Sequence, residues 1–252
     1  MEPENTYPDA NRSLIRGIEI LRCFRQGTNL LGNSEIAERT GLAPSTISRL
    51  TQTLVMTGFL EHDRRSSAYR LAPTVLGLGH AFKTGSPELR VAEPLMRKTS
   101  EKLKLNVGLA VADRTEMIYL ESIRYRKNIA LRTVASGQRV PIEQTSLGHA
   151  WIANLEPHAR ARLLSDLKLQ NAKNWHKTEK EINAAIRSIA NKGYCVASWL
   201  PQIGAISTIV HFADGQFAAL NLSSPADTHL HSVIESYVPA LFDLKNNIEN
   251  EL

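Results

Sequence analysis

The segment 41–56 carries two opposed faces at helical spacing. Ile47, Leu50 and Leu54 recur at i, i+3 and i+7 and form one apolar stripe. The opposite side holds hydroxyls, one guanidinium and one amide, on Ser45, Ser48, Arg49 and Gln52. Pro44 suits a first helical position, where its missing N–H would have no partner. The pattern predicts a helix from Pro44 with one face in a core and one polar face outside it.

A shorter amphipathic segment precedes this helix. Residues 34–40 direct Ile36 and Ala37 inward, and Gly41-Leu42 then forms a tight turn. Two helices joined by a glycine-containing turn form a helix-turn-helix, whose second helix reads the major groove. Polar side chains on that helix can bond base edges and phosphates. The predicted DNA contacts are Pro44, Ser45, Thr46, Ser48, Arg49 and Gln52. A solvated face in an ordinary helical bundle is the alternative.

A β-hairpin is predicted directly after this helix. Residues 59–60 and 69–71 form two short strands, and the basic polar stretch between them forms the tip. A hairpin in this position is the wing of a winged helix. Arg64 and Arg65 at its tip could meet phosphates or enter a minor groove. A solvated loop is the alternative, but the position after this particular helix favours DNA binding.

Further helices are expected before and after these elements. A helix over about 13–24 should pack through Leu14, Ile18 and Leu21. A connecting helix begins at Thr74, and Gly85-Ser86-Pro87 breaks it. Over 88–104, a seam with 3–4–3–4 spacing should pack on a sheet or on another subunit. Its members are Leu89, Ala92, Met96, Thr99 and Leu103.

From residue 107 onward, short runs rich in β-branched residues are bounded by turn residues, as is typical of strands. Strands are predicted over 107–112, 117–121, 129–134, 195–199, 205–212 and 217–222. Helices are predicted over 147–155, 158–167, 179–192 and about 230–248. Pro239 should kink or interrupt the last helix. The mixture indicates an α+β sheet domain that follows a mostly α winged helix-turn-helix domain.

Length and charge agree with a two-domain chain. At 252 residues with 42% hydrophobic residues, the chain exceeds the commonest single-domain size and can bury ordinary cores. We expect a flexible tail over 1–11, a DNA-binding domain over 12–73, a linker helix over 74–87 and a second domain over 88–252. The net charge is +5, and residues 12–85 alone carry ten Lys/Arg against five Asp/Glu. The basic excess therefore lies in the helix-turn-helix half, which favours nucleic-acid binding.

Cysteine usage and hydropathy indicate a cytoplasmic protein. Cys23 and Cys195 lie far apart and outside any CxxC, which predicts two buried thiols in a reducing compartment. No apolar run approaches the ~20 residues that a membrane span needs. The N-terminus lacks the basic and apolar regions of a signal peptide. We therefore expect no membrane association.

The sequence lacks three common signatures of enzymes. The chain has no Gly-x-Ser-x-Gly, no His-Glu-x-x-His and no Cys-rich cluster, so we expect no catalytic residue, metal or cofactor. An enzyme acting on a small metabolite in the C-terminal domain stays the main alternative. His229 and His231 could bind a metal, although a solvated pair is the commoner case. An adaptor whose winged helix contacts protein is a third possibility, which the concentration of basic charge disfavours.

Several motifs in order resemble the IclR (isocitrate lyase regulator) family of bacterial transcriptional regulators over nearly the whole chain. The motifs are Arg12–Leu21, Glu35–Leu42, Ser45–Leu50, Tyr69–Pro73, Leu76–Gly79, Ser146–Ala150, Gly193–Val196 and Ala218–Pro225. The resemblance implies a winged helix joined to a GAF-like effector-binding and oligomerisation domain. It also implies homodimers or homotetramers on a near-palindromic double-stranded DNA operator, controlled by a small-molecule effector. The sequence leaves open whether the effector tightens or weakens DNA binding.

Polar residues inside apolar strands suggest where an effector would bind. Strand alternation places Asn221 and Ser223 on one face of 217–223, and Ser207 interrupts another apolar run. If buried, such groups need partners, because an unpaired hydroxyl or amide costs about 1–3 kcal/mol. The resemblance implies an effector site at Ile129, Val140, Ser146, Leu147, Ala197, Ser207, Asn221 and Ser223. Satisfied core polar groups, or solvent-facing ones, are the alternative.

The predicted effector site contains no Arg or Lys. A small carboxylate would therefore depend on hydroxyls, an amide and backbone N–H groups. The helix beginning near Leu147 would aim free N–H groups at such an anion. A small organic or aromatic acid is the expected effector class.

Overall fold

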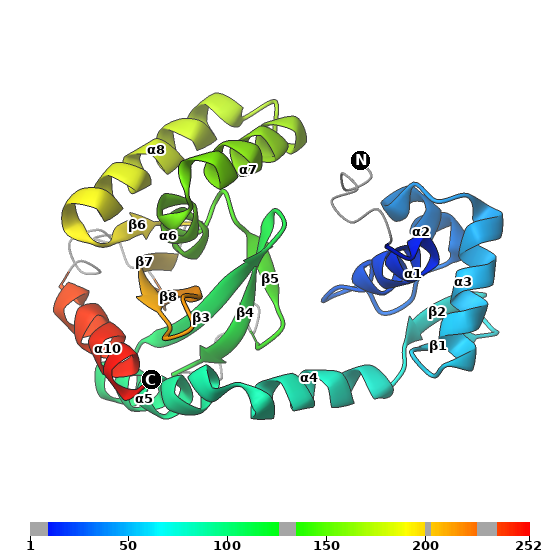
Figure 1. The fold of residues 1–252 in the computed structure, drawn as a ribbon, viewed down its shortest axis with the longest axis horizontal. Helices are drawn as coiled ribbons and strands as arrows, with labels where there is room; N and C mark the ends of the chain where they lie inside the picture. The colour runs from blue at the N-terminus through cyan, green and yellow to red at the C-terminus, as the bar shows by residue number, and fades with distance from the viewer. Residues whose placement is uncertain (1–9, 126–134, 200–202, 226–235) are drawn as a thin grey trace. The chain divides into compact units, whose positions relative to one another are not determined.

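The computed structural model describes residues 10–125, 135–199, 203–225 and 236–252. The chain divides into two units, Met1–Phe82 and Lys83–Leu252 (Figure 1). Each unit has hydrophobic cores of its own.

The first unit is a three-helix domain with a two-stranded hairpin. Its elements are α1 Arg12–Arg22, α2 Asn33–Thr40, α3 Pro44–Met56, β1 Leu60–Asp63 and β2 Ala68–Leu71. Gly41 ends α2 at φ 68°, a left-handed conformation that glycine adopts without steric cost. Pro44 begins α3, as its fixed φ favours. The turn and the wing that the sequence predicts are therefore confirmed.

The predicted packing stripe of α1 is wrong at Leu14 and Ile18, while its third member, Leu21, packs against the core. Leu14 and Ile18 are 63% and 45% exposed, whereas Gly17 and Ile20 are buried on the core side. The core of this unit gathers Ile20, Cys23, Leu31, Ile36, Ile47, Leu60 and Tyr69. Helical periodicity shows which residues share a face, but a helix with two apolar faces leaves open which of them packs.

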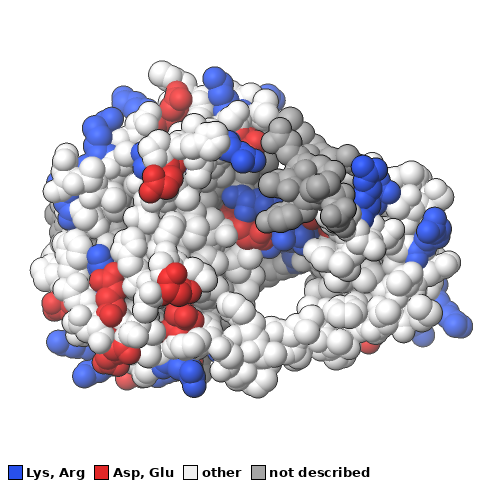
Figure 2. Space-filling model, viewed as in Figure 1, with Lys and Arg blue, Asp and Glu red and all other residues white. Residues whose placement is uncertain are grey.

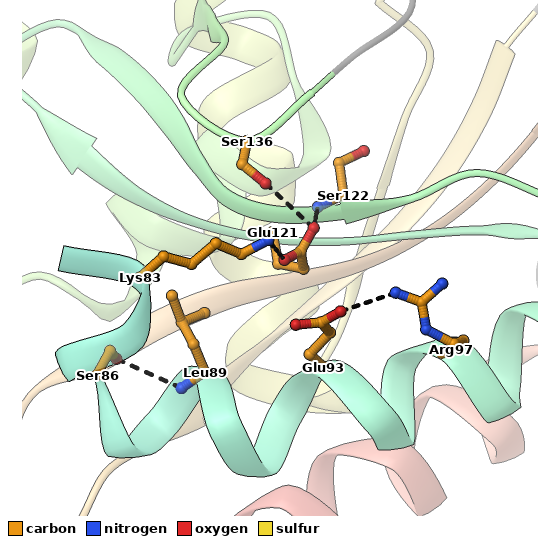
Figure 3. A network of polar contacts seen from close by, with 8 residues as sticks. All are labelled: Lys83, Ser86, Leu89, Glu93, Arg97, Glu121, Ser122 and Ser136. Carbon is orange, nitrogen blue, oxygen red and sulfur yellow. Dashed lines mark hydrogen bonds and ion pairs between the residues drawn. The ribbon is translucent and has the colours of Figure 1, made fainter. Parts of the chain in front are cut away.

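The linker helix α4, Thr74–Gly85, includes the boundary between the units and buries none of its side chains. Ser86 then caps α5, Pro87–Leu103, by accepting from the Leu89 N–H. At the end of α4, Lys83 Nζ lies 2.5 Å from the buried carboxylate of Glu121 (Figure 3). That carboxylate also accepts from the Ser122 N–H and the Ser136 hydroxyl. Lys83 and Glu121 both belong to the second unit, so this ion pair lies within that unit.

The second unit is built on one antiparallel sheet with the strand order β5-β4-β3-β8-β7-β6. The strands are β3 Asn106–Asp113, β4 Glu116–Ile123, β5 Arg139–Pro141, β6 Cys195–Ala197, β7 Ile203–His211 and β8 Phe217–Pro225. Helix α5 and α10, Val238–Glu251, pack on one face. On the other face lie α6 Ser146–Asn154, α7 Pro157–Gln170 and α8 Trp175–Lys192 (Figure 1).

Both sheet faces follow the alternation that the sequence predicts. Leu220 and Leu222 enter the α5–α10 core, while Ala219 enters the α6–α8 core. Leu89, Ala92 and Met96 of the α5 seam are buried against the sheet. The two cysteines are buried and free, as expected.

Two details of the second unit differ from the sequence prediction, and a third concerns residues that the structure does not describe. Helix α8 begins at Trp175, one turn before the predicted start. Pro239 does not interrupt the last helix but lies in its first turn, where a missing N–H is harmless. The predicted strand 129–134 lies outside the described residues.

Candidate functional site

Helix α3 presents the predicted polar face to solvent. Pro44, Ser45, Arg49 and Gln52 are exposed, and Thr46 and Ser48 are partly exposed. The opposite face is in the core, where Ile47 is buried and Leu50 and Leu54 pack against its neighbours. The structure therefore brings all six predicted residues of this helix to one accessible surface.

Two contacts fix how this helix is held. Asn33, at the start of α2, donates from its side-chain amide to the Ser48 hydroxyl at 3.3 Å. The buried Thr51 hydroxyl donates to the Ile47 carbonyl at 2.9 Å. Asn33 escaped the sequence analysis, because only the crossing of α2 over α3 places it beside the polar face. It orients Ser48 and joins the two helices at the surface where the DNA contacts are expected.

The wing tip is shaped by Asp63. Its carboxylate accepts from the Arg65 N–H at 2.9 Å and from the Ser66 hydroxyl at 3.0 Å, and these bonds hold the pKa of Asp63 below its usual value. Ser67 completes the tip at φ 50°. Arg64 and Arg65 are exposed there. The tip is thus ordered by its own hydrogen bonds and carries two accessible guanidinium groups.

Charge on the first unit suits an anionic partner. Its visible surface, on the right in Figure 2, shows Lys and Arg side chains with little acidic surface between them. Arg70 bonds Glu61 across the wing at 2.7 Å. An exposed polar helix with accessible arginines matches the electrostatic requirement for contacting phosphates.

In the second unit, strand register gathers most of the predicted effector residues on one sheet face. Ser207, Asn221 and Gly108 lie directly opposite one another on β7, β8 and β3. The next row along the strands contains Ala197, Ala205, Ser223 and Asn106. The Ser207 hydroxyl donates to the Ser146 hydroxyl at 2.7 Å, and both groups are buried. We call this surface, covered by the start of α6, the polar sheet face.

The remaining predicted residues divide into two groups. Leu147 and Val140 are buried in the core on the same side of the sheet. Ile129 lies outside the described residues. Ser146, Ala197, Ser207, Asn221 and Ser223 therefore lie on or against the polar sheet face, while Val140 and Leu147 lie in the core on the same side of the sheet.

Gly108 permits a close contact that sequence reasoning missed. A Cβ at this position would lie 2.5 Å from Tyr119 Cε1 and 2.6 Å from Asn221 Oδ1. Burial raises the pKa of Tyr119, whereas the Arg124 charge and a hydrogen bond with Asn221 lower it. Tyr119, Asn221 and Arg124 are thus neighbours on the polar sheet face. The signal in the sequence was a glycine inside a strand, which often marks a close approach.

The N-terminus of α6 is more occupied than expected. Thr145 caps it by accepting from the Gly148 N–H at 3.2 Å, so this N–H is not free for an anion. A Cβ on Gly148 would clash with the backbone carbonyl of Ile142. Next to it, His149 is buried with Nε2 2.9 Å from the Glu143 carbonyl oxygen, and burial lowers the pKa of His149. Because Thr145 caps this turn, it offers fewer free N–H groups to an anionic ligand than the sequence suggested.

Two kinds of feature are absent from the described residues. They contain no group of three His, Cys, Asp or Glu side chains that could hold a metal ion. They also contain no helix long and apolar enough to cross a membrane. His229 and His231 lie outside the described residues.

A winged helix-turn-helix with an exposed polar recognition helix, followed by an α+β domain with a buried polar sheet face, defines a DNA-binding transcriptional regulator. Family models agree with this class. The IclR helix-turn-helix domain matches residues 13–64, and the bacterial transcriptional regulator IclR C-terminal domain matches residues 87–250. The chain belongs to the IclR family.

Relatives and solved structures add to this assignment. The chain is 35% identical to the HTH-type transcriptional regulator TsaQ1/TsaQ2 of Comamonas testosteroni over 73% of its own length and 66% of that protein. An IclR family transcriptional regulator from Brucella abortus superposes with a TM-score of 0.90 at 29% identity, covering 100% of this chain and 97% of that one. An IclR homologue from Microbacterium hydrocarbonoxydans, complexed with 4-hydroxybenzoate, shares the fold with a TM-score of 0.67 at 22% identity, covering 95% and 98%.

Proposed function

We propose that this IclR-type regulator binds a near-palindromic operator through α3 and the wing, and that a small organic or aromatic acid bound at the polar sheet face controls it. The proposed DNA contacts are Pro44, Ser45, Thr46, Ser48, Arg49, Gln52, Arg64 and Arg65. The proposed effector contacts are Val140, Ser146, Leu147, Ala197, Ser207, Asn221 and Ser223. The exposed polar face of α3 is the observation that carries the DNA-binding part.

Unburied apolar side chains support assembly into dimers or tetramers. Leu14 and Ile18 of α1 are exposed, and so are Leu76, Leu78 and Phe82 of α4. Apolar side chains gathered on solvent-facing helices are typical of surfaces that another protein covers. A second copy of this chain would pair two recognition helices on half-sites about one DNA turn apart. Such a regulator acts in the cytoplasm, where the DNA is.

The composition of the polar sheet face supports the proposal that an effector binds there. Ser207, Asn221 and Ser146 bring two hydroxyls and an amide to a buried surface, where polar groups can orient a small ligand. A ligand that binds one arrangement of the oligomer more tightly shifts the population towards it. The spacing of the paired recognition helices would change with that population. The 4-hydroxybenzoate bound by the Microbacterium homologue makes this acid the first probe to use.

The test of DNA recognition is Arg49→Ala. DNA flanking the gene is footprinted with the wild-type protein, the variant and Arg90→Ala, an exposed arginine of α5 that serves as the charge-matched control. We expect Arg49→Ala to lower specific affinity by about 10- to 100-fold, since a bidentate arginine–base contact contributes about 1–3 kcal/mol. Its unfolding midpoint should stay unchanged because Arg49 is exposed. Retained sequence preference in Arg49→Ala would overturn the assignment of α3.

A footprint with and without candidate acids tests effector control. If no acid in a broad panel alters the footprint, control by an acid is refuted while the DNA assignment stands. The alternative of an enzyme needs a nucleophile beside a base. In the described contacts, Ser146 and Ser207 bond each other, and the His149 ring bonds the Glu143 carbonyl rather than either serine.

A further inference from the structure

Arg124 lies at the edge of the polar sheet face. Ile123, the last residue of β4, pairs with Val107, and both side chains enter the core under α5. Arg124 follows Ile123 directly, and its charge acts on the Tyr119 phenol, which packs on the opposite face of the sheet. The N–H of the next residue, Tyr125, donates to the side chain of Asn106 at 3.3 Å, and Asn106 pairs with Ser223. Arg124 therefore lies beside the row that contains Ala197, Ala205 and Ser223.

Within the described part of the chain, no carboxylate contributes to the environment of Arg124. Its Nε is buried and has no hydrogen-bond partner among the described residues. Burial lowers the pKa of Arg124, yet an arginine stays protonated in proteins, so the half-buried guanidinium keeps its charge. The group next to this charge is the Tyr119 phenol, whose pKa burial raises, so it is uncharged near neutral pH and supplies no counter-charge. Tyr119 in turn bonds Asn221 at the centre of the polar sheet face.

Two other half-buried arginines of this unit are satisfied within the protein. Arg139 on β5 pairs with Asp113 and Glu116. Arg160 on α7 donates to three backbone carbonyls that follow α6, those of Ile152, Ala153 and Leu155. Arg124 differs from both, because the described residues supply no carboxylate to it. A half-buried guanidinium whose Nε is buried without a hydrogen bond is suited to an external anion.

We propose that Arg124 binds the carboxylate of the effector, with Tyr119 and Asn221 positioned beside it. This inference rests on the proposed effector control and names the group that selects acids over neutral molecules. The guanidinium offers paired N–H donors in one plane, which match the two oxygens of a carboxylate. The carboxylate replaces the missing hydrogen bond of Nε and offsets the buried positive charge.

The register also constrains the size of the ligand. Arg124 leaves from β4, while the Ser146–Ser207 pair lies over β7, three strands away. Three strand spacings amount to about 14 Å, of which the arginine side chain spans a part. Between these two ends, Tyr119 and Asn221 lie over Gly108, and Ala205 and Ala197 contribute only methyl groups. The geometry suits an acid whose second polar group is separated from the carboxylate by a single ring.

The experiment compares acids with their neutral amides. Binding to the full-length protein is measured by titration calorimetry for benzoate, 4-hydroxybenzoate, a 2-oxo acid and a dicarboxylate, each beside its amide. The same series is run on Arg124→Gln, on Arg124→Lys and on Arg187→Gln. Arg187 is an exposed residue of α8, so its variant matches the loss of charge away from the polar sheet face. Thermal unfolding without ligand and a footprint of each variant show that fold and DNA binding are kept.

We expect one of the acids to bind while its amide does not. Arg124→Gln should weaken that binding by about 10- to 100-fold, as the loss of a charge-assisted hydrogen bond predicts. Arg124→Lys should retain part of the affinity, and Arg187→Gln should retain all of it. Equal binding of acid and amide, equal affinity in Arg124→Gln, or no binding of any acid would each overturn the proposal. A footprint that responds to a neutral molecule would keep effector control and reject only the role of Arg124.

Discussion

The two units hold their candidate sites in opposite ways. In the first unit, Ser45, Arg49 and Gln52 are exposed on a helix whose other face fills the core. In the second, Ser146 and Ser207 are buried and bonded to each other under α6. Buried polar groups must be satisfied whether or not a ligand is present, while exposed ones are satisfied by water. Substitutions at the first site should therefore change binding with little effect on stability, and substitutions around the second should change both.

The largest effect expected is that of Gly148→Ala. The added methyl group would clash with the Ile142 carbonyl, which is backbone and cannot rotate away. We expect the second unit to lose about 3 kcal/mol or more of its free energy of unfolding, as overpacking at a rigid contact does. Chemical denaturation followed by tryptophan fluorescence measures this unit, since Trp151, Trp175 and Trp199 all belong to it.

Gly77→Ala is the matched control for this substitution. Gly77 lies in α4, and a Cβ there would meet nothing within 4 Å. Alanine should stabilise this helix by about 0.5–1 kcal/mol relative to glycine, so the free energy of unfolding that tryptophan fluorescence reports for the second unit should not fall. Equal effects of the two substitutions would show that the close approach of α6 to the Ile142 carbonyl does not constrain the fold.

The second effect concerns the ion pair between Lys83 and Glu121 (Figure 3). Lys83→Met leaves a buried carboxylate with the Ser122 N–H and the Ser136 hydroxyl but without its cation. We expect the second unit to lose about 1–3 kcal/mol of stability, the usual cost of an incompletely satisfied buried group. Adding Glu121→Gln removes the uncompensated charge and should recover part of the loss. A double-mutant cycle by urea denaturation measures the coupling, and strictly additive effects would contradict it.

The third effect separates the wing from the recognition helix. Arg64→Ala combined with Arg65→Ala removes two exposed charges from the hairpin tip. If both contact phosphates, the slope of log affinity against log salt should fall by about 0.9 per contact. The loss should be similar for specific and unrelated DNA, unlike that of Arg49→Ala. Fluorescence anisotropy over a salt series measures it, with the exposed Arg162→Ala of α7 as control. An unchanged slope would mean that the wing does not touch the phosphates.

The smallest effect is a pH dependence from His149. Burial lowers the folded-state pKa of this imidazole below the value of about 6.5 of an unfolded chain, so the unfolded state binds the proton first. Stability is therefore complete above about pH 6.5 and falls as the pH drops towards the folded pKa, by at most about 1.4 kcal/mol per pH unit. His149→Gln should remove this slope, while the exposed His176→Gln should keep it. Urea denaturation over a pH series measures the difference, and equal slopes would refute it.

Residues close together in sequence were the ones that sequence analysis could place. Ile47 inward and Arg49 outward follow from helical spacing within one element, and the alternation of Leu220 and Asn221 follows from strand spacing. The prediction for α1 was wrong at Leu14 and Ile18, because these two residues share a regular apolar stripe but do not contact the core of the first unit. The spacing of apolar residues does not show which other element a given face of a helix packs against.

In the candidate sites too, the contacts that the sequence did not reveal join residues that lie far apart along the chain. Ser146 and Ser207 are 61 residues apart, and they meet because α6 begins over β7. Asn33 reaches Ser48 through the crossing of α2 and α3. Arg124 lies at the polar sheet face because β4 pairs with β3 up to the residue before it. Its own segment contains no recognisable motif, so the sequence did not indicate this position. Each of these contacts depends on long-range packing that no local pattern encodes.

The sequence by itself determined the order of elements, the two faces of α3, the wing and the family to which the chain belongs. Local steric preferences and the period of apolar residues act within a few residues, so they can be read along the chain. Tertiary structure decided which apolar face is buried, which glycines admit a close contact, and which polar groups share a buried surface. Those outcomes depend on strand register and helix packing, which bring together residues that the chain itself separates.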